Sequence, residues 1–111
     1  MSQSLLTDRF WEARENDVQL PDHAANSSPE IEHALRTANV DGAVSFYSSG
    51  TTGDARCVIH SRAGLLASAR AVNAHLDART EDVWLCALPV FHVGGFGVYA
   101  RAYCSGSMVC G

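Results

Sequence analysis

The sequence predicts an α/β fold, namely part of a layered αβ sheet preceded by a short helical N-terminal segment. Three observations support this prediction. Apolar residues recur at helical spacing between 62 and 78, apolar runs lie on either side of that segment at 43–47 and 83–88, and a helix-like segment follows at 94–105. The resulting order of strand, helix, strand, helix and strand is typical of α/β architecture. With 111 residues the chain is at most one modest domain.

The first 41 residues are predicted to be a helical and linker segment. Residues 2–15 suit a short helix, and residues 16–29 are rich in Pro, Asn, Asp and Ser, which is typical of a connector. A further helix is predicted from Pro29 through Ala38, because proline suits the first helical position and Ser28 can serve as the N-cap. We expect ordered structure to begin at Gly42 and therefore divide the chain into 1–41 and 42–111.

The predicted sheet begins with a strand at 43–47 and a shorter one at 57–60. Ser61 is the predicted N-cap of a helix over 62–78. Its side chains at i, i+4, i+7 and i+11 form one apolar stripe that we expect to be buried: Leu65, Ala69, Val72 and Leu76. The polar side chains away from this stripe are expected to face solvent: Arg62, Arg70, Asn73 and Asp77.

The second half of the predicted sheet follows this helix. Residues 83–88 form an unbroken apolar run, which predicts a strand covered on both faces. A loop at 89–92, a helix at 94–105 and the start of a strand at 108–110 complete the series. Because the chain stops where that strand starts, we expect it to be part of a larger domain.

Charge and cysteine content narrow the classes of partner and compartment. Residues 1–41 carry eight acids and three arginines, whereas residues 42–111 carry four acids and five arginines. A net charge of −4 without a basic cluster makes nucleic acid an unfavourable partner. The cysteines lack zinc spacing and are expected to be free, buried thiols in a reducing cytoplasm: Cys57, Cys86, Cys104 and Cys110. The first residues lack a signal-peptide pattern.

A membrane span is one alternative for residues 83–100, which carry no formal charge. Pro89, His92 and three glycines interrupt this stretch, so a strand, a loop and a helix explain it better. The pattern Gly95-x-Gly97-x-x-Ala100 also matches a dinucleotide fingerprint, but it does not directly follow a strand as that fingerprint requires. We therefore expect no membrane span and do not favour a dinucleotide site.

The most informative segment is the loop between the first two predicted strands, Ser48-Ser49-Gly50-Thr51-Thr52-Gly53. Glycines let the backbone approach a ligand, successive N–H groups can enclose an anion, and hydroxyls add hydrogen-bond donors. Arg56 adds a positive charge three residues later. The loop is not a Walker A sequence, because the chain contains no lysine. It predicts a phosphate site, with a flexible connector as the alternative.

Two segments resemble a known family. Tyr47 through Arg56 resembles the phosphate-loop signature of the adenylate-forming (AMP-binding) superfamily, and Leu88-Pro89-Val90-Phe91-His92-Val93-Gly94-Gly95 resembles the second core motif of its acyl-CoA synthetase branch. The residues of these two motifs are most similar to those of o-succinylbenzoate–CoA ligases of menaquinone synthesis. Three positions depart from the usual signature: Ala55 stands for proline, Arg56 for lysine and Cys57 for glycine.

The resemblance implies a cytoplasmic ligase that activates a small carboxylate with Mg²⁺ and ATP to an acyl-adenylate and then forms a coenzyme A thioester. It implies that the ATP phosphates are bound by Ser48, Ser49, Gly50, Thr51, Thr52, Gly53 and Arg56. It also implies that His92 is catalytic, between the nucleotide and acyl sites, and that His92, Gly94 and Gly95 border the acyl pocket. For His92 the alternative is a polar side chain satisfied in a glycine-rich turn.

Other features limit what the chain is expected to do alone. His60 is expected to be structural, and the remaining histidines, His23, His33 and His75, are expected to face solvent; their spacing predicts no resident metal. The downstream family motifs and the C-terminal lysine that assists adenylation do not occur in these 111 residues. The chain is therefore expected to be an inactive N-terminal fragment of such a ligase; the alternative is a truncated non-catalytic remnant or a weak nucleotide-binding module.

Overall fold

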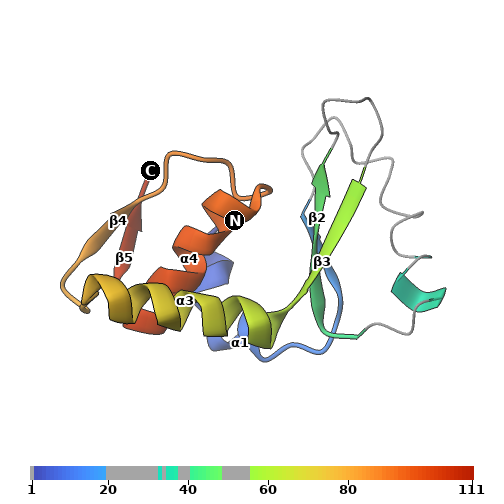
Figure 1. The fold of residues 1–111 in the computed structure, drawn as a ribbon, viewed down its shortest axis with the longest axis horizontal. Coiled ribbons are helices and arrows are strands. Elements are labelled where there is room, and N and C mark those ends of the chain that lie inside the picture. Colours follow the sequence, from blue (N-terminus) through green and yellow to red (C-terminus); the bar gives the residue numbers. More distant parts are fainter. Residues whose placement is uncertain (1, 20–32, 34, 38–40, 49–55) are drawn as a thin grey trace.

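The computed structural model describes residues 2–19, 33, 35–37, 41–48 and 56–111 and confirms the α/β fold (Figure 1). A three-stranded sheet has the order β1-β2-β3, and a two-stranded sheet pairs β4 with β5. The elements in chain order are η1 (Ser2–Leu6), α1 (Asp8–Trp11), β1 (Asp17–Gln19), β2 (Ala43–Ser48), β3 (Arg56–Ser61), α3 (Arg62–Leu76), β4 (Val83–Leu85), α4 (Val93–Ser105) and β5 (Met108–Cys110). Residues 33 and 35–37 are also helical.

The first sheet contains both strands predicted around the hydroxyl-rich loop and one that was not predicted. β2 and β3 pair antiparallel from Ala43↔Ser61 to Ser48↔Arg56. β1 pairs parallel to β2, so the prediction that residues 17–19 belong to a connector is wrong. The Asn16 side chain fixes the start of this pairing, because its Oδ1 accepts a 2.9 Å hydrogen bond from the Ala43 amide. A three-residue strand is too short to show the alternating pattern that identifies strands.

The start of α3 agrees with the sequence prediction. The Ser61 side chain accepts a 2.9 Å hydrogen bond from the Gly64 amide and so caps one of the free N–H groups of the first turn. Ala69 is buried and Leu65 packs against the core, as expected. Leu76 is 58% exposed, so the prediction that the whole stripe is buried is wrong in the last turn.

Arg62 also differs from its prediction, because it is only 6% exposed. Its Nη1 donates a 2.6 Å hydrogen bond to the Glu15 carbonyl, and its guanidinium carbon lies 4.8 Å from the centre of the Phe10 ring. Burial lowers the pKa of the guanidinium, while the charges of Asp17 and then Glu15 act in the opposite direction. Arg62 therefore joins the N-terminal segment to the beginning of α3.

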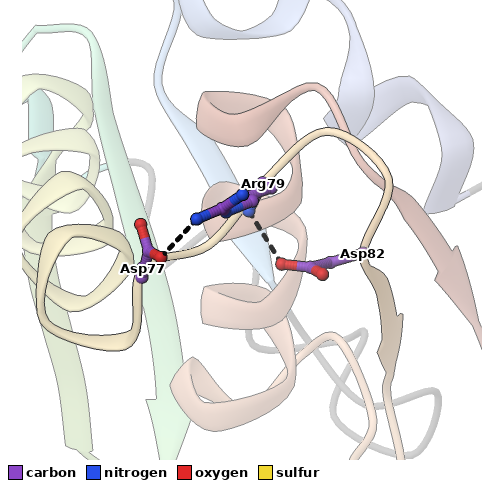
Figure 2. Close-up of polar contacts among 3 residues, drawn as sticks. All are labelled: Asp77, Arg79 and Asp82. Carbon is purple, nitrogen blue, oxygen red and sulfur yellow. Dashed lines mark hydrogen bonds and ion pairs between the residues drawn. The ribbon is translucent and has the colours of Figure 1, made fainter.

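The α3–β4 connection is held by polar contacts of Arg79 (Figure 2). α3 ends at Leu76, and its C-cap residue Asp77 adopts the left-handed conformation with φ of 54°. Arg79 Nη2 lies 2.9 Å from Asp77 Oδ2, and the Arg79 amide donates a 2.7 Å hydrogen bond to Asp82 Oδ2. Because the ion pair is exposed, it contributes only about 0.2–1 kcal/mol.

β4, α4 and β5 form a βαβ unit in which the two strands are parallel. β4 is shorter than the predicted 83–88 strand, and the prediction that both of its faces are covered is wrong. Val83, Leu85 and Met108 are 63%, 72% and 70% exposed. Val109, the next residue of β5 after Met108, packs against the core. One face of this strand pair is therefore apolar and open to water.

The hydrophobic core includes the N-terminal segment. Leu5 and Trp11 are buried together with Phe46 of β2 and Phe96 of α4. The Trp11 indole donates a 2.7 Å hydrogen bond to the Leu5 carbonyl, and its ring meets the Phe96 ring with centroids 5.7 Å apart. Ordered packing thus begins before Gly42, contrary to expectation.

None of the helices described in the structure is both long and apolar enough to cross a membrane. The longest, α3, has 15 residues, whereas a spanning helix needs about 20 apolar residues. The helix that begins in the uncharged stretch, α4, has 13 residues and follows the Pro89–His92 turn.

Candidate functional site

The hydroxyl-rich loop closes the β2–β3 hairpin. Ser48 is the last residue of β2 and pairs with Arg56, the first residue of β3. The predicted phosphate ligands Ser49, Gly50, Thr51, Thr52 and Gly53 lie outside the described residues. The backbone register places Ser48 and Arg56 across from each other at the two ends of this loop. The paired strands thereby fix both ends of the candidate phosphate site.

The second motif forms the turn that leads into α4. The His92 amide donates a 3.1 Å hydrogen bond to the Pro89 carbonyl, and the His92 carbonyl accepts a 2.9 Å hydrogen bond from the Phe96 amide. His92 is the N-cap residue of α4, with an extended backbone and no capping hydrogen bond from its side chain. The imidazole is exposed and lies against the Phe91 ring, with centroids 4.8 Å apart. It is therefore accessible to a substrate.

Gly94 and Gly95 differ in their surroundings. Gly94 is exposed, and a Cβ added there would meet Leu88 Cδ1 at 2.9 Å. Gly95 is buried, and an added Cβ would lie 2.2 Å from the Pro89 carbonyl oxygen and 2.6 Å from that of Leu88. The space beside Gly95 is thus occupied by backbone. The assignment of these glycines to an acyl pocket stays a prediction.

An aromatic contact connects the two elements that carry the motifs. Phe46 of β2 and Phe96 of α4 meet edge to face, with ring centroids 5.1 Å apart. In Figure 1 the loop end of the hairpin and the beginning of α4 point toward the same, upper side of the view. The core therefore sets the direction of the phosphate-loop strand relative to the His92 turn.

Arg101 is a candidate residue that the sequence reasoning missed. Its Nε is buried without a hydrogen-bond partner among the described residues, and its guanidinium carbon lies 5.2 Å from the Trp84 ring centre. A buried donor without a partner requires an explanation, and a ligand is one. The available signal was that Arg101 is the sole Asp, Glu, Lys or Arg between residues 83 and 111.

Of the remaining titratable groups, the Cys86 thiol lies beside the second motif, 3.2 Å from the Leu88 carbonyl oxygen. His60 contacts the Phe46 ring, and His33 and His75 are exposed, as expected; His23 lies outside the described residues. Cys86 and Cys104 are half-buried free thiols, but Cys110 is exposed, so the prediction of a buried thiol is wrong there. Burial raises the pKa of Cys104, against the opposing charge of Arg70. No cluster of three or more potential metal ligands occurs within the described parts of the chain.

Two surface hollows can be described, and neither contains a predicted site residue. One of about 240 Å³ lies between α3 and α4, beside Asn73 and Cys104. The other, of about 360 Å³, lies beside Phe10 and Arg62. The candidate site is therefore defined by the hairpin and the His92 turn rather than by these hollows.

Comparison with protein families and curated sequences extends these observations. The family described as AMP-binding enzyme matches residues 3–110. The 2-succinylbenzoate–CoA ligase of Bacillus cereus (strain Q1) is 32% identical over 98 residues, which is 87% of this chain and 20% of that protein. The enzyme of the same name from Enterococcus faecalis is 42% identical over 55 residues, 50% of this chain and 11% of that protein. The chain thus spans about a fifth or less of these relatives' length.

Solved structures show the same likeness. A variant of E. coli MenE with bound OSB-AMS matches with a TM-score of 0.54 and 30% identity, over 60% of this chain and 15% of that one. VinN matches over 98% of this chain and 36% of its own, with a TM-score of 0.55 and 19% identity, which supports the fold alone.

Proposed function

Because the chain belongs to the AMP-binding enzyme family, we propose that it forms part of an ATP-dependent carboxylate–CoA ligase. In this proposal the ligase forms an acyl-adenylate and then an acyl-CoA thioester, with a 2-succinylbenzoate-like aromatic carboxylate as substrate. Residues 42–111 carry the phosphate loop and the start of the acyl pocket.

The observation that supports this proposal most strongly is the placement of the two motifs on adjoining elements. The phosphate-loop sequence closes a hairpin whose strand β2 packs through Phe46 on Phe96 of α4, and α4 begins directly after His92. A coincidental Ser/Thr/Gly linker would not require this second motif. The 32% identity to a 2-succinylbenzoate–CoA ligase covers both motifs, since it extends over 87% of the chain.

ATP is proposed to bind through its β- and γ-phosphates at residues 48–53 and Arg56. Attack of a carboxylate on the α-phosphorus builds negative charge on the departing pyrophosphate, and fixed N–H and hydroxyl donors can stabilise that charge. Arg56 keeps the positive charge of the usual lysine but presents a planar, bidentate fork. Mg²⁺ is proposed to arrive with ATP and to neutralise part of the phosphate charge.

The acyl side of the site is proposed to begin at His92. Its exposed imidazole can donate to or accept from the carboxylate as it approaches the nucleotide. Coenzyme A is the proposed acceptor of the acyl group.

The proposal is tested by carboxylate-dependent ATP–pyrophosphate exchange in the intact protein from its native source, whose mass is measured first. We expect exchange with 2-succinylbenzoate, and we expect the double variant Thr51→Ala/Thr52→Ala to abolish both the exchange and protection of the loop by Mg-ATP. Ser68→Ala, an exposed change on α3, is the matched control and should retain both. A protein of family length that binds ATP without exchange with any aromatic carboxylate would refute the ligase and favour a non-catalytic nucleotide-binding module.

A further inference from the structure

The turn from Leu88 to His92 is held against the first turn of α4 by unusually close backbone contact. Gly95 is buried, and a Cβ at this position would lie 2.2 Å from the Pro89 carbonyl oxygen, far below any van der Waals separation. The contact is with backbone, which cannot rotate away as a flexible side chain can. The backbone carbonyls of Leu88 and Pro89 can occupy this place only because residue 95 has no side chain.

The Cys86 thiol also contacts both the turn and the helix. Cys86 follows β4, and its amide donates a 2.8 Å hydrogen bond to the Cys110 carbonyl, which anchors it to the sheet. Its Sγ lies 3.2 Å from the Leu88 carbonyl oxygen and 3.6 Å from that of Gly95. The thiol therefore bridges the turn and the helix that the turn precedes.

These contacts continue directly to His92. The Pro89 carbonyl, which touches Gly95, accepts the hydrogen bond from the His92 amide. The His92 side chain itself makes no capping hydrogen bond. The backbone of the turn therefore sets the position from which the imidazole projects, and the ring lies against Phe91 with centroids 4.8 Å apart.

We propose that Gly95 is a positioning residue, which fixes the His92 imidazole through the Leu88–Pro89 turn instead of providing open space for the acyl group. The inference rests on the proposed function for the importance of His92 to the reaction. The placement of the ring by Gly95 stands on geometry alone. It gives Gly95 a different role from Gly94, although the two are neighbours in the sequence.

The decisive variant is Gly95→Ala, and Gly97→Ala is its matched control. Both place the same methyl group in the same helix, where alanine is a better helix former than glycine. The added Cβ at Gly97 would meet only the end of the Arg101 side chain, at 3.2 Å, which can move. The readout is the NMR signals of the His92 ring in the intact protein. We expect them to shift in Gly95→Ala and to stay near their original positions in Gly97→Ala.

A second variant covers the case in which Gly95→Ala fails to fold. Cys86→Ala removes the thiol between Leu88 and Gly95 without adding volume, and it should shift the same His92 ring signals by a smaller amount. Ring signals that stay unchanged in a folded Gly95→Ala protein, or in Cys86→Ala if the former does not fold, would overturn the inference.

Steady-state kinetics of pyrophosphate exchange separate this inference from the proposed function. In the intact ligase we expect Gly95→Ala to lower kcat for pyrophosphate exchange by about 10–100-fold, with the KM for ATP within about twofold, because misplacement by about 1 Å can cost 100-fold. His92→Ala should lower kcat at least as much. If His92→Ala leaves the exchange rate unchanged, the proposed role of His92 fails, while the ring signals still decide the positioning.

Discussion

The Tyr103 hydroxyl donates a 2.5 Å hydrogen bond to Asp8 Oδ1 across 95 positions of sequence. Tyr103 also stacks on Trp11, with ring centroids 5.7 Å apart. This pair of contacts attaches the N-terminal segment to α4, which begins at the candidate site. The stability of the N-terminal segment and that of the site are therefore linked through α4.

Removal of the Tyr103 hydroxyl should weaken this attachment. Tyr103→Phe keeps the stacking on Trp11 but loses the hydrogen bond to a carboxylate, so we expect a loss of about 1 kcal/mol in the free energy of unfolding. Urea unfolding followed by tryptophan fluorescence measures it. A variant as stable as the parent would show that the Asp8 contact contributes nothing in solution.

The same bond predicts a dependence on alkaline pH. The hydrogen bond to Asp8, followed by burial, raises the pKa of Tyr103 to about 12. Between about pH 10 and pH 12 the folded chain therefore keeps a proton that the unfolded chain has lost, and the free energy of unfolding falls as pH rises. Tyr103→Phe should flatten this decline in urea titrations across that range. If the free energy of unfolding fell equally with pH in the parent and in Tyr103→Phe, this prediction would be contradicted.

The two ends of the α3 stripe should respond differently to the same substitution. Leu65 packs against the core, whereas Leu76 is mostly exposed. Leu65→Asp places a carboxylate beside apolar side chains and should unfold this part of the chain. Leu76→Asp should change the free energy of unfolding by only about 0.5 kcal/mol. Circular dichroism during thermal unfolding compares them, and equal losses would disprove the burial difference.

Phe96 should be the most costly aromatic residue to truncate. It is fully buried and contacts the rings of Phe10, Trp11 and Phe46. Phe96→Ala should lower the free energy of unfolding by about 3–5 kcal/mol, because it leaves a cavity where three rings meet. Phe91→Ala, at a partly exposed position, is the control and should cost less. Similar losses in denaturant unfolding would argue against this core.

The N-cap of α3 offers a milder test. Ser61→Ala removes the acceptor for the Gly64 amide and should lower the free energy of unfolding by about 1 kcal/mol. Ser68→Ala, in the exposed middle of α3, should stay within about 0.5 kcal/mol of the parent. Chemical denaturation measures both variants. Equal losses in the free energy of unfolding for Ser61→Ala and Ser68→Ala would refute the cap.

Much of the fold could be predicted because its signals are local. The Ser61 cap, the limits of α4 and the strands around the hydroxyl-rich loop follow from residues within a few positions of each element. The errors lie where residues far away in the sequence determine whether a side chain is buried. Arg62 is buried because Glu15 and Phe10, far away in the sequence, surround it. Leu76 is 58% exposed although it continues the apolar stripe, because periodicity alone does not show where the core ends.

The sequence motifs predict which residues form the candidate site, but they do not predict the contacts that these residues make. The second motif predicts His92, Gly94 and Gly95 as site residues. Sequence periodicity cannot reveal that the Pro89 carbonyl lies against Gly95. Arg101 was missed because a single arginine in a helix resembles an ordinary surface residue until the burial of its Nε is known.

The water-facing side of the β4–β5 pair has a practical consequence for purification. Val83, Leu85 and Met108 together present an apolar patch, and a net charge of −4 gives only modest repulsion between copies. Sulfate salts strengthen the association of such patches, since they are excluded from protein surfaces. The polypeptide should therefore precipitate early in ammonium sulfate fractionation and stay dispersed best in dilute buffers well above its isoelectric point of about 5.6.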